Sequence, residues 1–510
     1  MKGSRVVLIS LYSSDAIGPR YISSFLKKHG VDVNIIFFKE KFLETDIMSL
    51  PTEREYELLI DLIKKCDPDI VGLSLRSSFF NISVLLTSKI KEHIDKPVIW
   101  GGTHPTIAPD DCITVADMIC IGEGEYPMLE LAQRICDGHD ISNIQNLWLR
   151  RENEIVKNPL RQLNQDLDAL PFPDYGSSGK YFIENNSVNE SDPVTEAFNL
   201  NVMTSRGCPY NCAYCSNSVF IDLSRGKGPL VRRRSVNNVI EEIETMREIF
   251  PNLMRVDFID EVFAWDKTWT SEFRKKYKER INLPFQCAQH PNMITEDILR
   301  YLVESGLERV SLGIQSGSER IRREIYGRPV TDEILLRAGK ILRDANIVPM
   351  YDLIVDNPFE TDDDLRAGLE FLLKLPRPYH MRMFPLTYFP NTKLTKMAIK
   401  AGKITEEQVE NKAERTHSKW FVTLDYPWPD RERYWISLYA LTSKSFVPRK
   451  FIRWLSEISF FNTRPKILSF VATLANNIKL GTIAIRWLIE GKSFRDVFRQ
   501  STSKQSHWQV

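Results

Sequence analysis

The first 140 residues alternate short, continuous apolar runs with longer stretches in which apolar residues recur every three or four positions. Continuous apolar runs are typical of parallel strands buried on both faces, and the longer spacing indicates helices with one buried side. Strands are expected at 6–10, 31–38, 70–75, 97–102 and 118–122, and helices at 19–29, 52–65, 79–94 and 126–137. This alternation predicts a Rossmann-like, doubly wound α/β domain over residues 1–140.

Residues 141–195 lose this regularity and are expected to form a linker. A hairpin is expected from 147 to 157, followed by extended chain around 171–176, because residues before proline avoid the helical region. The polar stretch 185–193 is expected to be mobile.

The alternation of strands and helices resumes over residues 196–405. Strands are expected at 198–204, 255–260, 284–288, 309–314, 348–355 and 381–387, each followed by a helix. Six such units are too many for the first sheet and indicate a second α/β domain. Residues 406–510 have helical spacing and hold six of the ten tryptophans, so a mainly helical C-terminal extension is expected.

Composition and charge restrict the classes of function. A chain of 510 residues predicts about three domains, and 43% hydrophobic with 26% charged residues is typical of a globular protein. The net charge of +1 provides no general attraction for nucleic acid. The N-terminus lacks the features of a signal peptide, and no run approaches the ~20 apolar residues that span a bilayer. We expect a cytoplasmic protein without a transmembrane segment or a nucleic-acid partner.

Three cysteines lie within eight positions, just after the first strand of the second α/β domain. They are Cys208, Cys212 and Cys215 in the stretch Thr-Ser-Arg-Gly-Cys-Pro-Tyr-Asn-Cys-Ala-Tyr-Cys. Structural zinc needs a fourth ligand, and the candidates Cys287 and His290 lie on an expected strand that would point them to opposite faces. A disulfide is disfavoured in a reducing compartment. A cubane iron–sulfur cluster held by three cysteines leaves one iron with an open position, where chemistry can occur.

The C-x3-C-x2-C spacing, with Tyr214 directly before the last cysteine, resembles the signature of radical S-adenosylmethionine (SAM) enzymes. The resemblance implies a 4Fe-4S cluster whose open iron binds SAM and cleaves it to a 5′-deoxyadenosyl radical. It also implies that residues 196–405 form a partial (β/α)6 barrel of the TIM type. Catalytic groups of such barrels lie at the carboxyl ends of the strands, where the cysteines are found.

Later strand ends extend the resemblance. Phe-Ile-Asp-Glu-Val-Phe at 258–263 is similar to an acidic motif that contacts the SAM amino group, and Gly-Ile-Gln-Ser-Gly-Ser at 313–318 is similar to another SAM-contacting element. Asp260 could instead cap a helix. The run Arg232-Arg233-Arg234 could meet the SAM carboxylate or an acidic substrate, although a solvated face is the preferred interpretation. The SAM-binding residues expected from the resemblance are Tyr214, Asp260, Glu261, Gln315 and Ser316.

The loops after the strands of the first domain contain neither GxGxxG nor a Walker-type sequence, which argues against dinucleotide or ATP binding. Their glycines would let a bulky, flat ligand approach the backbone. The phrases Gly-Gly-Thr-His-Pro-Thr and Ile-Gly-Glu-Gly-Glu resemble the cobalamin-binding domain that precedes many radical SAM domains. The residues that this resemblance assigns to cobalamin are Arg76, Ser77, Gly101, Gly102, Thr103, Gly122, Glu123 and Gly124.

The usual cobalamin motif D-x-H-x-x-G is missing, because the loop from Ser13 to Gly18 has no histidine. The resemblance to radical SAM enzymes, many of which also lack this histidine, implies cobalt without a protein imidazole below it. His104 is a possible substitute, but a histidine that hydrogen-bonds its own loop is the preferred interpretation. Arg76 could contact the ligand or cap a helix. The remaining cysteines, at 66, 112, 120, 136 and 287, are expected to be ordinary buried thiols.

The resemblance implies that a deoxyadenosyl radical abstracts hydrogen from an unactivated carbon, to which methylcobalamin delivers a methyl group. Rearrangement, cyclisation or oxidation without methyl transfer is one alternative, and a non-catalytic cobalamin or redox sensor is another. The implied partners are a small-molecule or lipid-like substrate and an electron donor such as flavodoxin or ferredoxin. The C-terminal extension could cap the barrel, line a lipophilic pocket, or touch a membrane through 446–488.

Overall fold

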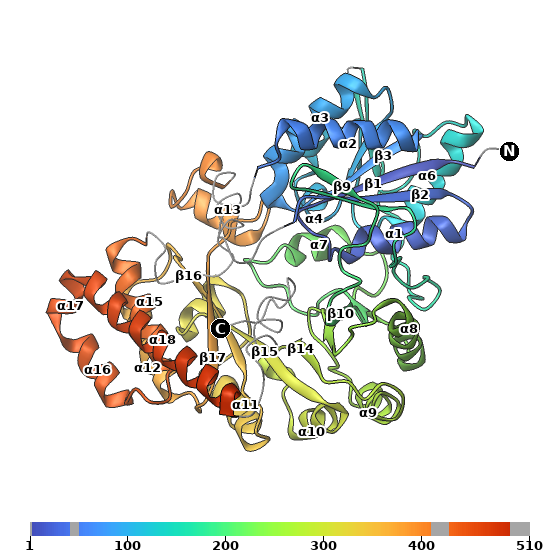
Figure 1. Cartoon of the computed structure of the whole chain (residues 1–510). Coiled ribbons are helices and arrows are strands. Elements are labelled where there is room, and N and C mark those ends of the chain that lie inside the picture. The colour runs from blue at the N-terminus through green and yellow to red at the C-terminus, as the bar shows by residue number, and fades with distance from the viewer. Residues whose placement is uncertain (1–2, 41–49, 153, 410–427, 490–510) are drawn as a thin grey trace. The chain divides into compact units, whose positions relative to one another are not determined.

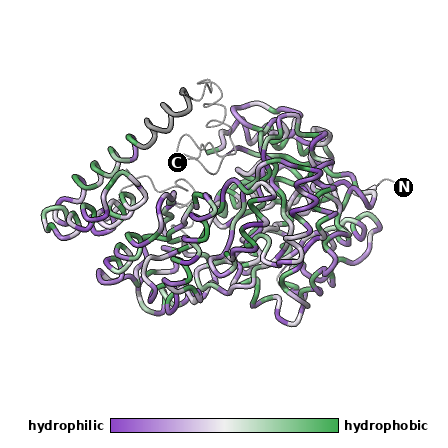
Figure 2. Tube along the Cα trace, turned by 90° about the horizontal axis from the view of Figure 1, so that it is seen from below, coloured by the Kyte–Doolittle hydropathy of each residue, from purple (hydrophilic) through white to green (hydrophobic). Residues whose placement is uncertain are grey.

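The computed structural model describes residues 3–40, 50–152, 154–409 and 428–489, with side chains described up to residue 478. The chain forms two compact units (Figure 1). Unit 1 comprises Met1–Glu196, Ser205–Asn252 and Thr387–Ser418, and unit 2 comprises Ala197–Thr204, Leu253–Leu386 and Lys419–Val510. Along both units, apolar residues are interleaved with polar ones, as expected of elements with one buried face (Figure 2).

Unit 1 is built on a nine-stranded sheet in the order β7-β6-β5-β4-β3-β1-β2-β8-β9. Strands β1 to β5 are parallel, and β8 runs parallel to β2. The strands are β1 Arg5–Leu11, β2 Asp32–Phe38, β3 Ile70–Ser74, β4 Val98–Gly101, β5 Met118–Cys120, β6 Leu147–Arg151, β7 Glu154–Lys157, β8 Lys180–Glu184 and β9 Ser187–Asn189. All five strands expected in the first domain are present, and the doubly wound topology is confirmed.

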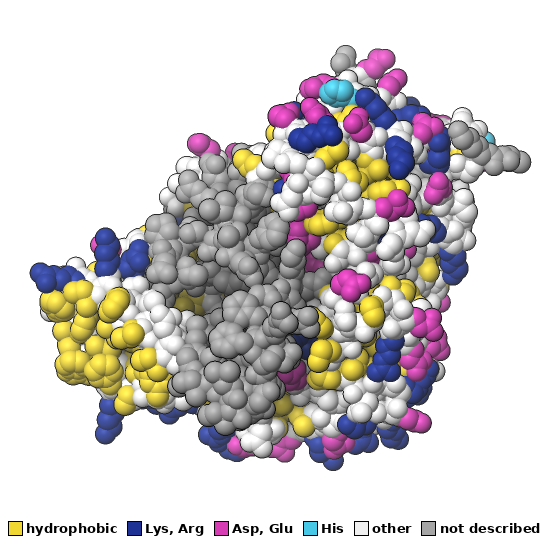
Figure 3. Space-filling model, viewed as in Figure 1, with side chains coloured by type: hydrophobic (Ala, Val, Ile, Leu, Met, Phe, Trp, Pro, Cys, Tyr) yellow, Lys and Arg dark blue, Asp and Glu magenta, His cyan; other side chains and the backbone are white. Residues whose placement is uncertain are grey.

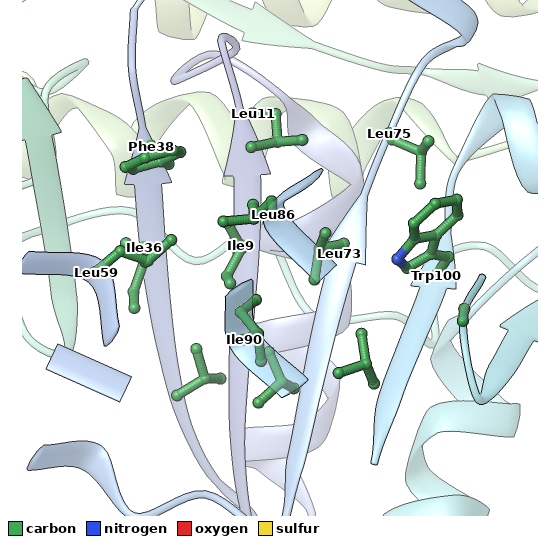
Figure 4. Packing of buried hydrophobic residues seen from close by; sticks show 14 of the residues in the cluster. Ile9, Leu11, Ile36, Phe38, Leu59, Leu73, Leu75, Leu86, Ile90 and Trp100 are labelled. Carbon is green, nitrogen blue, oxygen red and sulfur yellow. The ribbon is translucent and has the colours of Figure 1, made fainter. Parts of the chain in front are cut away.

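Alternate side chains of these strands enter two hydrophobic cores, one on each face of the sheet. Ile9 and Leu11 of β1 point to the core that contains Trp100 and residues of α2 and α3, as Figure 4 shows. Val6 and Leu8 point to the opposite core, beside α1 and α6. Helices of this domain are α1 Ile17–Lys28, α2 Glu53–Cys66, α3 Phe80–His93, α4 Thr103–Ile107, α5 Pro109–Ile113 and α6 Glu125–Asp137, with a 3-10 turn η1 Ser77–Phe79.

Residues 141–195 supply β6 to β9 and thereby widen this sheet at both edges. The expected hairpin is present as β6 and β7, which pair antiparallel beside β5. The stretch 185–193 contains β9 and then Asp192, which is fully buried against Arg20 with Oδ2 2.6 Å from Nη1. Strand pairing and a buried ion pair thus attach this stretch to unit 1, and its expected mobility stays a prediction.

Unit 1 also contains the segment that carries the cysteine motif and, from later in the chain, α13 Lys393–Lys400. The elements of the cysteine-bearing segment are β11 Ser205–Arg206, α7 Asn217–Leu223, β12 Arg232–Arg233 and α8 Val236–Ile249. Strands β11 and β12 pair antiparallel and bring together the two ends of the cysteine-bearing segment.

Unit 2 contains a six-stranded parallel sheet whose strands lie in chain order, β10-β13-β14-β15-β16-β17. Chain-order parallel strands connected by helices form the partial barrel expected from the sequence. The strands are β10 Asn199–Val202, β13 Arg255–Phe258, β14 Phe285–Gln289, β15 Leu307–Gln315, β16 Met350–Val355 and β17 His380–Pro385. The helices are α9 Lys267–Lys276, α10 Glu296–Ser305, α11 Asp332–Asp344 and α12 Asp362–Lys374, with short turns η2 Tyr277–Ile281, η3 Pro291–Met293 and η4 Ile321–Ile325.

The C-terminal extension is helical where it is described, as expected. It contains α15 Asp430–Thr442, α16 Arg449–Glu457, α17 Ser459–Thr463 and α18 Pro465–Ile489. Helix α15 is buried on most sides, and the Tyr439 hydroxyl donates a hydrogen bond of 2.8 Å to the Leu365 carbonyl of α12. The aromatic residues of α15 therefore attach the extension to the outside of the sheet through α12.

Candidate cofactor-binding sites

The cysteine motif lies on a loop of unit 1 whose shape depends on Gly207. Gly207 has φ +88°, and a Cβ at this position would lie 2.3 Å from the Leu230 carbonyl oxygen. Only glycine permits both the left-handed backbone and this close approach. Leu230 precedes β12, so the contact closes the hairpin from which the loop emerges. The loop after Gly207 then presents the three cysteines.

Cys212 is buried, while Cys208 and Cys215 are half-buried. The Cys215 amide donates to the Cys212 carbonyl at 3.1 Å, and the Ser218 amide donates to the Cys215 carbonyl at 3.0 Å as α7 begins. No disulfide joins any of the eight cysteines. Three thiol donors on one loop fit the chemistry of an iron–sulfur cluster. Among the described residues, no group of three or more His, Cys, Asp or Glu side chains is already arranged as a metal site. The cluster assignment therefore depends on the motif and the family.

Thr106, the last residue of the phrase Gly-Gly-Thr-His-Pro-Thr, was not assigned a role from the sequence, but it joins the loops after β4 and β5. The Thr106 hydroxyl donates to the Gly102 carbonyl at 2.8 Å and accepts from the Gly122 amide at 3.0 Å. The Leu75 amide donates to the Gly101 carbonyl at 3.0 Å. These bonds bring most of the residues assigned to cobalamin to one edge of the sheet, where doubly wound domains bind ligands.

The residues assigned to cobalamin differ in how far they are exposed to solvent. Arg76, Gly102 and Thr103 are exposed, so they leave the carboxyl ends of β3 and β4 open to a ligand. Arg76 precedes η1 without a side-chain capping bond, so the alternative role as a helix cap is not seen. A Cβ on Gly102 would lie 2.8 Å from the Leu75 carbonyl oxygen, and its φ is +101°. The backbone of Leu75 and the positive φ therefore require glycine at position 102, whether or not a ligand is bound.

His104 is buried, and its Nδ1 lies 3.0 Å from the Ser77 hydroxyl. Burial lowers the pKa of His104 to about 4, so the ring is neutral at physiological pH. Its partner belongs to the neighbouring loop, so the expectation of a bond within its own loop is wrong. Among the described residues, the His104 Nε2 has no hydrogen-bond partner. An unsatisfied buried nitrogen beside these loops fits a domain that takes up a polar ligand.

Glu123 and Glu125 connect the cobalamin-type loop to the hairpin that carries the cysteine loop. Glu123 Oε1 and Oε2 accept bonds of 2.8 and 3.0 Å from Arg232, and Arg206 Nη2 lies 2.5 Å from Glu125 Oε1. Arg206 Nη1 also lies 3.4 Å from Glu123. In the sequence, the only indication that these two segments are joined was that Arg206 lies two residues before the first cysteine.

The arginine run at 232–234 is not a solvated face, and that preferred interpretation is wrong. The Arg232 and Arg234 side chains are buried. Arg234 pairs with Glu242 of α8, and its Nη1 lies 3.3 Å from the Tyr21 hydroxyl. Burial of a guanidinium is tolerated only where a carboxylate compensates its charge, as both of these ion pairs do. The run therefore joins elements within unit 1.

In unit 2, Asp260 holds the end of β10. Its carboxylate accepts bonds of 3.1 Å from the Thr204 amide, and Oδ1 accepts one of 2.8 Å from the Thr204 hydroxyl. The following helix is capped by Asp266, whose Oδ1 accepts from the Trp269 amide at 2.6 Å. The alternative role of Asp260 as a helix cap is therefore wrong. Glu261, beside it, is exposed.

The last residue of β15, Gln315, is assigned to SAM and has a strained conformation. Gln315 has φ +71°, which is uncommon for a residue other than glycine, and its side chain lies against Gly313. Such strain is typical of functional sites. The buried Ser316 donates a 2.7 Å hydrogen bond to Glu360 Oε1. Burial, followed by the charges of Glu432 and Asp364, raises the pKa of Glu360 to about 8.

The other cysteines do not form a second cluster-binding set in the described structure. Cys112, Cys120 and Cys287 are buried as expected, and burial raises the pKa of the Cys120 thiol to about 12. Cys66 is half-buried. Cys136 is exposed, so the expectation of a buried thiol is wrong there, since the last turn of α6 faces solvent.

Two families match this chain in the two regions that carry these features. Residues 202–372 match the Radical SAM superfamily, and residues 5–132 match the B12 binding domain. The chain belongs to the cobalamin-binding radical SAM enzymes. Its cofactors are accordingly a 4Fe-4S cluster, SAM and cobalamin.

Individual relatives agree with this membership. An uncharacterized methyltransferase of Pyrococcus horikoshii is 28% identical over 393 residues, which cover 75% of this chain and 78% of that one. The cytidylyl-2-hydroxyethylphosphonate methyltransferase of Streptomyces wedmorensis is 23% identical over 373 residues, covering 66% and 67%. The solved structure of the cobalamin-dependent SAM radical enzyme OxsB, with aqua-cobalamin and SAM bound, has a TM-score of 0.64 at 16% identity. It covers 92% of this chain and 72% of that one. This similarity shows a shared fold.

Proposed function

We propose that this protein is a cobalamin-dependent radical SAM methyltransferase that methylates an unactivated carbon of a small-molecule or lipid-like substrate. The observation that carries the proposal is the presence of both family domains in one chain whose similar proteins include methyltransferases. The ion pairs of Glu123 and Glu125 support it, because they attach the cobalamin-type loop to the hairpin of the cysteine loop. Rearrangement, cyclisation or oxidation without methyl transfer remains the second candidate reaction.

The residues of this chain have separable tasks in that proposal. When bound, the cluster and SAM supply a deoxyadenosyl radical, and cobalamin supplies the methyl group. Cys208, Cys212 and Cys215 hold the cluster. Asp260 fixes the Thr204 end of β10 directly before the cysteine segment, and Glu261 offers a carboxylate to the SAM ammonium. Tyr214, Gln315 and Ser316 complete the proposed SAM contacts.

The cobalamin-type loops contribute binding surface. Arg76 and Thr103 offer polar groups to cobalamin, and the positive φ of Gly102 and Gly122 lets the loops bend at the sheet edge. Gly101 and Gly124 complete the proposed cobalamin contacts. Ser77 positions His104, and Glu123 positions the cluster hairpin. The electron donor that reduces the cluster is a low-potential protein such as flavodoxin or ferredoxin. A reducing compartment such as the cytoplasm suits eight cysteines without a disulfide.

The test uses protein reconstituted without oxygen with iron, sulfide and hydroxocobalamin, and supplied with reductant and SAM that carries a trideuterated methyl group. We expect two products that mass spectrometry separates: deoxyadenosine, and methylcobalamin that carries the labelled methyl group. The Cys212→Ala variant is the control and should form no deoxyadenosine.

Each alternative gives a different result in the same assay. Deoxyadenosine without labelled methylcobalamin would favour the reaction without methyl transfer. Protein that binds cobalamin but yields neither product would be a sensor and would contradict the proposal. Candidate substrates are then screened for a mass gain of one labelled methyl group.

A further inference from the structure

The large exposed apolar side chains of the C-terminal extension gather on its last described helices. Figure 3 shows them as a continuous yellow area edged by basic side chains. We call this surface the aromatic patch; it consists of Phe446, Phe451, Trp454, Phe460, Ile467, Phe470, Leu474 and Ile478. Trp454 is 52% exposed and Phe470 is 69% exposed, so the rings face solvent rather than the protein core.

The same helices already bury another apolar face. Ile452 and Leu455 of α16 are buried, as are Leu468 and Ala472 of α18. Phe470, Leu474 and Ile478 form an exposed stripe at four-residue spacing on α18. A helix that is apolar on both sides is normally covered on both sides. A contiguous apolar surface of this kind marks a binding surface.

The charges around the aromatic patch indicate what covers it. Residues 443–478 contain six basic residues and one acidic residue, Glu457. Lys444 is buried and Arg453 pairs with Glu370 of α12, so the basic side chains left at the surface are Arg449, Lys450, Arg464 and Lys466. Lys450 and Lys466 are exposed and form no ion pair within the described structure. The Arg464 guanidinium lies 5.0 Å from the centre of the Phe460 ring. Aromatic rings interleaved with basic residues are typical of helices that lie in the headgroup region of anionic membranes.

Two other occupants fit less well. No helix among the described residues is both long enough and apolar enough to cross a bilayer, so the patch is not one side of a spanning segment. A symmetric dimer through the patch would bring two equally basic surfaces together, and their repulsion opposes that contact. An anionic surface compensates the same charge.

We propose that the aromatic patch docks this protein on an anionic lipid bilayer. The rings of Trp454 and Phe470 insert between headgroups, while Lys450 and Lys466 remain beside the lipid phosphates. The helices lie along the membrane surface in this arrangement. This docking does not depend on the proposed methyl transfer.

The experiment measures sedimentation of the full chain with two kinds of vesicle, phosphatidylcholine alone and phosphatidylcholine with one third phosphatidylglycerol. We expect binding to the anionic vesicles. The double variant Trp454→Ser/Phe470→Ser should lower the partition coefficient by about tenfold or more, because two aromatic side chains no longer leave water. The matched control, Leu50→Ser/Met254→Ser, removes apolar side chains that are 71% and 53% exposed elsewhere and should bind like the parent protein.

A second pair of variants tests the charge. Lys450→Glu/Lys466→Glu should weaken binding to anionic vesicles by about tenfold or more, as should added salt. Lys278→Glu/Lys403→Glu, which changes two exposed lysines outside the patch, should have little effect. Unchanged thermal unfolding of each variant confirms that it is folded.

Three results would overturn the proposal. The first is no sedimentation of the parent protein with either vesicle, and the second is equal binding to both. The third is a monomer–dimer equilibrium in analytical ultracentrifugation that Trp454→Ser/Phe470→Ser abolishes, without any vesicle binding by the parent. That result would make the patch an interface between two copies of the chain.

Discussion

The Glu123 carboxylate and the Arg232 guanidinium form a two-point ion pair, with N–O distances of 2.8 and 3.0 Å. Glu123 belongs to the loop after β5, and Arg232 belongs to β12 of the cysteine-bearing segment. The Arg232 side chain is only 2% exposed, so it depends on this carboxylate for compensation of its charge. Glu123, assigned to cobalamin from the sequence, thus also joins the two cofactor-binding segments.

Glu123→Gln is expected to lower the free energy of unfolding by about 2 kcal/mol, because the buried arginine loses its anionic partner. Differential scanning fluorimetry of the cofactor-free protein measures this loss as a lower melting temperature. Glu130→Gln is the control: it breaks the more exposed pairs with Arg134 and Arg161 and should cost less than about 1 kcal/mol. Unchanged stability of Glu123→Gln, together with weaker cobalamin binding, would instead make Glu123 mainly a ligand contact.

The cysteine loop is expected to be unusually sensitive to substitution of Gly207. Gly207→Ala adds a Cβ 2.3 Å from a backbone oxygen and also strains a left-handed backbone, so a loss of about 3 kcal/mol or more and poor cluster incorporation are expected. Gly226→Ala separates the two effects. Gly226 also has positive φ, at +75°, but a Cβ there meets nothing within 4 Å, so about 1 kcal/mol is expected.

Iron content after reconstitution and thermal unfolding measure both variants. If Gly226→Ala proves as harmful as Gly207→Ala, backbone strain rather than the contact with Leu230 controls the loop.

Each cysteine of the motif is expected to be necessary for the cluster. Cys208→Ala, Cys212→Ala and Cys215→Ala should each reduce bound iron and sulfide to trace levels, because two thiolates do not hold a cubane cluster. Cys136→Ala changes an exposed cysteine of unit 1 and should retain the full content of iron. A cluster that survives Cys215→Ala would show that another ligand substitutes, and the open iron position would then be in doubt.

Local sequence pattern was sufficient to predict strands β1 to β5, the β6–β7 hairpin and the six strands of the second sheet. The strands around Ile9 and Ile36 and the six later strands were found because burial on both faces leaves a continuous apolar run. Short elements such as α4 and β12 were missed, since a few residues show no periodicity. Strand β8 was missed because its three consecutive apolar residues lie between two charged ones, and β9 was missed because it is short and exposed at the sheet edge.

The cysteine motif was visible because its three cysteines lie within eight positions of one another in the chain. Long-range polar pairs were not visible in the same way. Arg20 and Asp192 are 172 residues apart, and only folding shows that their charges compensate each other. The arginines at 232 and 234 appeared to be surface residues, because charge runs usually are. They are buried instead, because each pairs with a carboxylate from elsewhere in the fold that compensates its charge.

Glu360 is expected to make stability depend on pH in the direction opposite to most carboxylates. Its pKa in the folded protein, about 8, lies above the ordinary value of 4.5, chiefly because of burial. Between these values the folded state holds a proton that the unfolded state has released, so the free energy of unfolding falls as pH rises. Glu360→Gln removes that proton linkage but keeps an acceptor for the Ser316 hydroxyl.

Relative to the parent protein, Glu360→Gln should therefore be nearly neutral at about pH 5 and stabilising by about 3 kcal/mol at about pH 9. Melting temperatures of both proteins across this range measure the difference. Ser316→Ala is the companion variant, because it removes the hydrogen bond that opposes the rise in the pKa and should shift the transition to higher pH. A difference between Glu360→Gln and the parent that is constant with pH would mean that Glu360 is ionised in the folded protein. Glu360 would then carry a negative charge beside Ser316 instead of a proton.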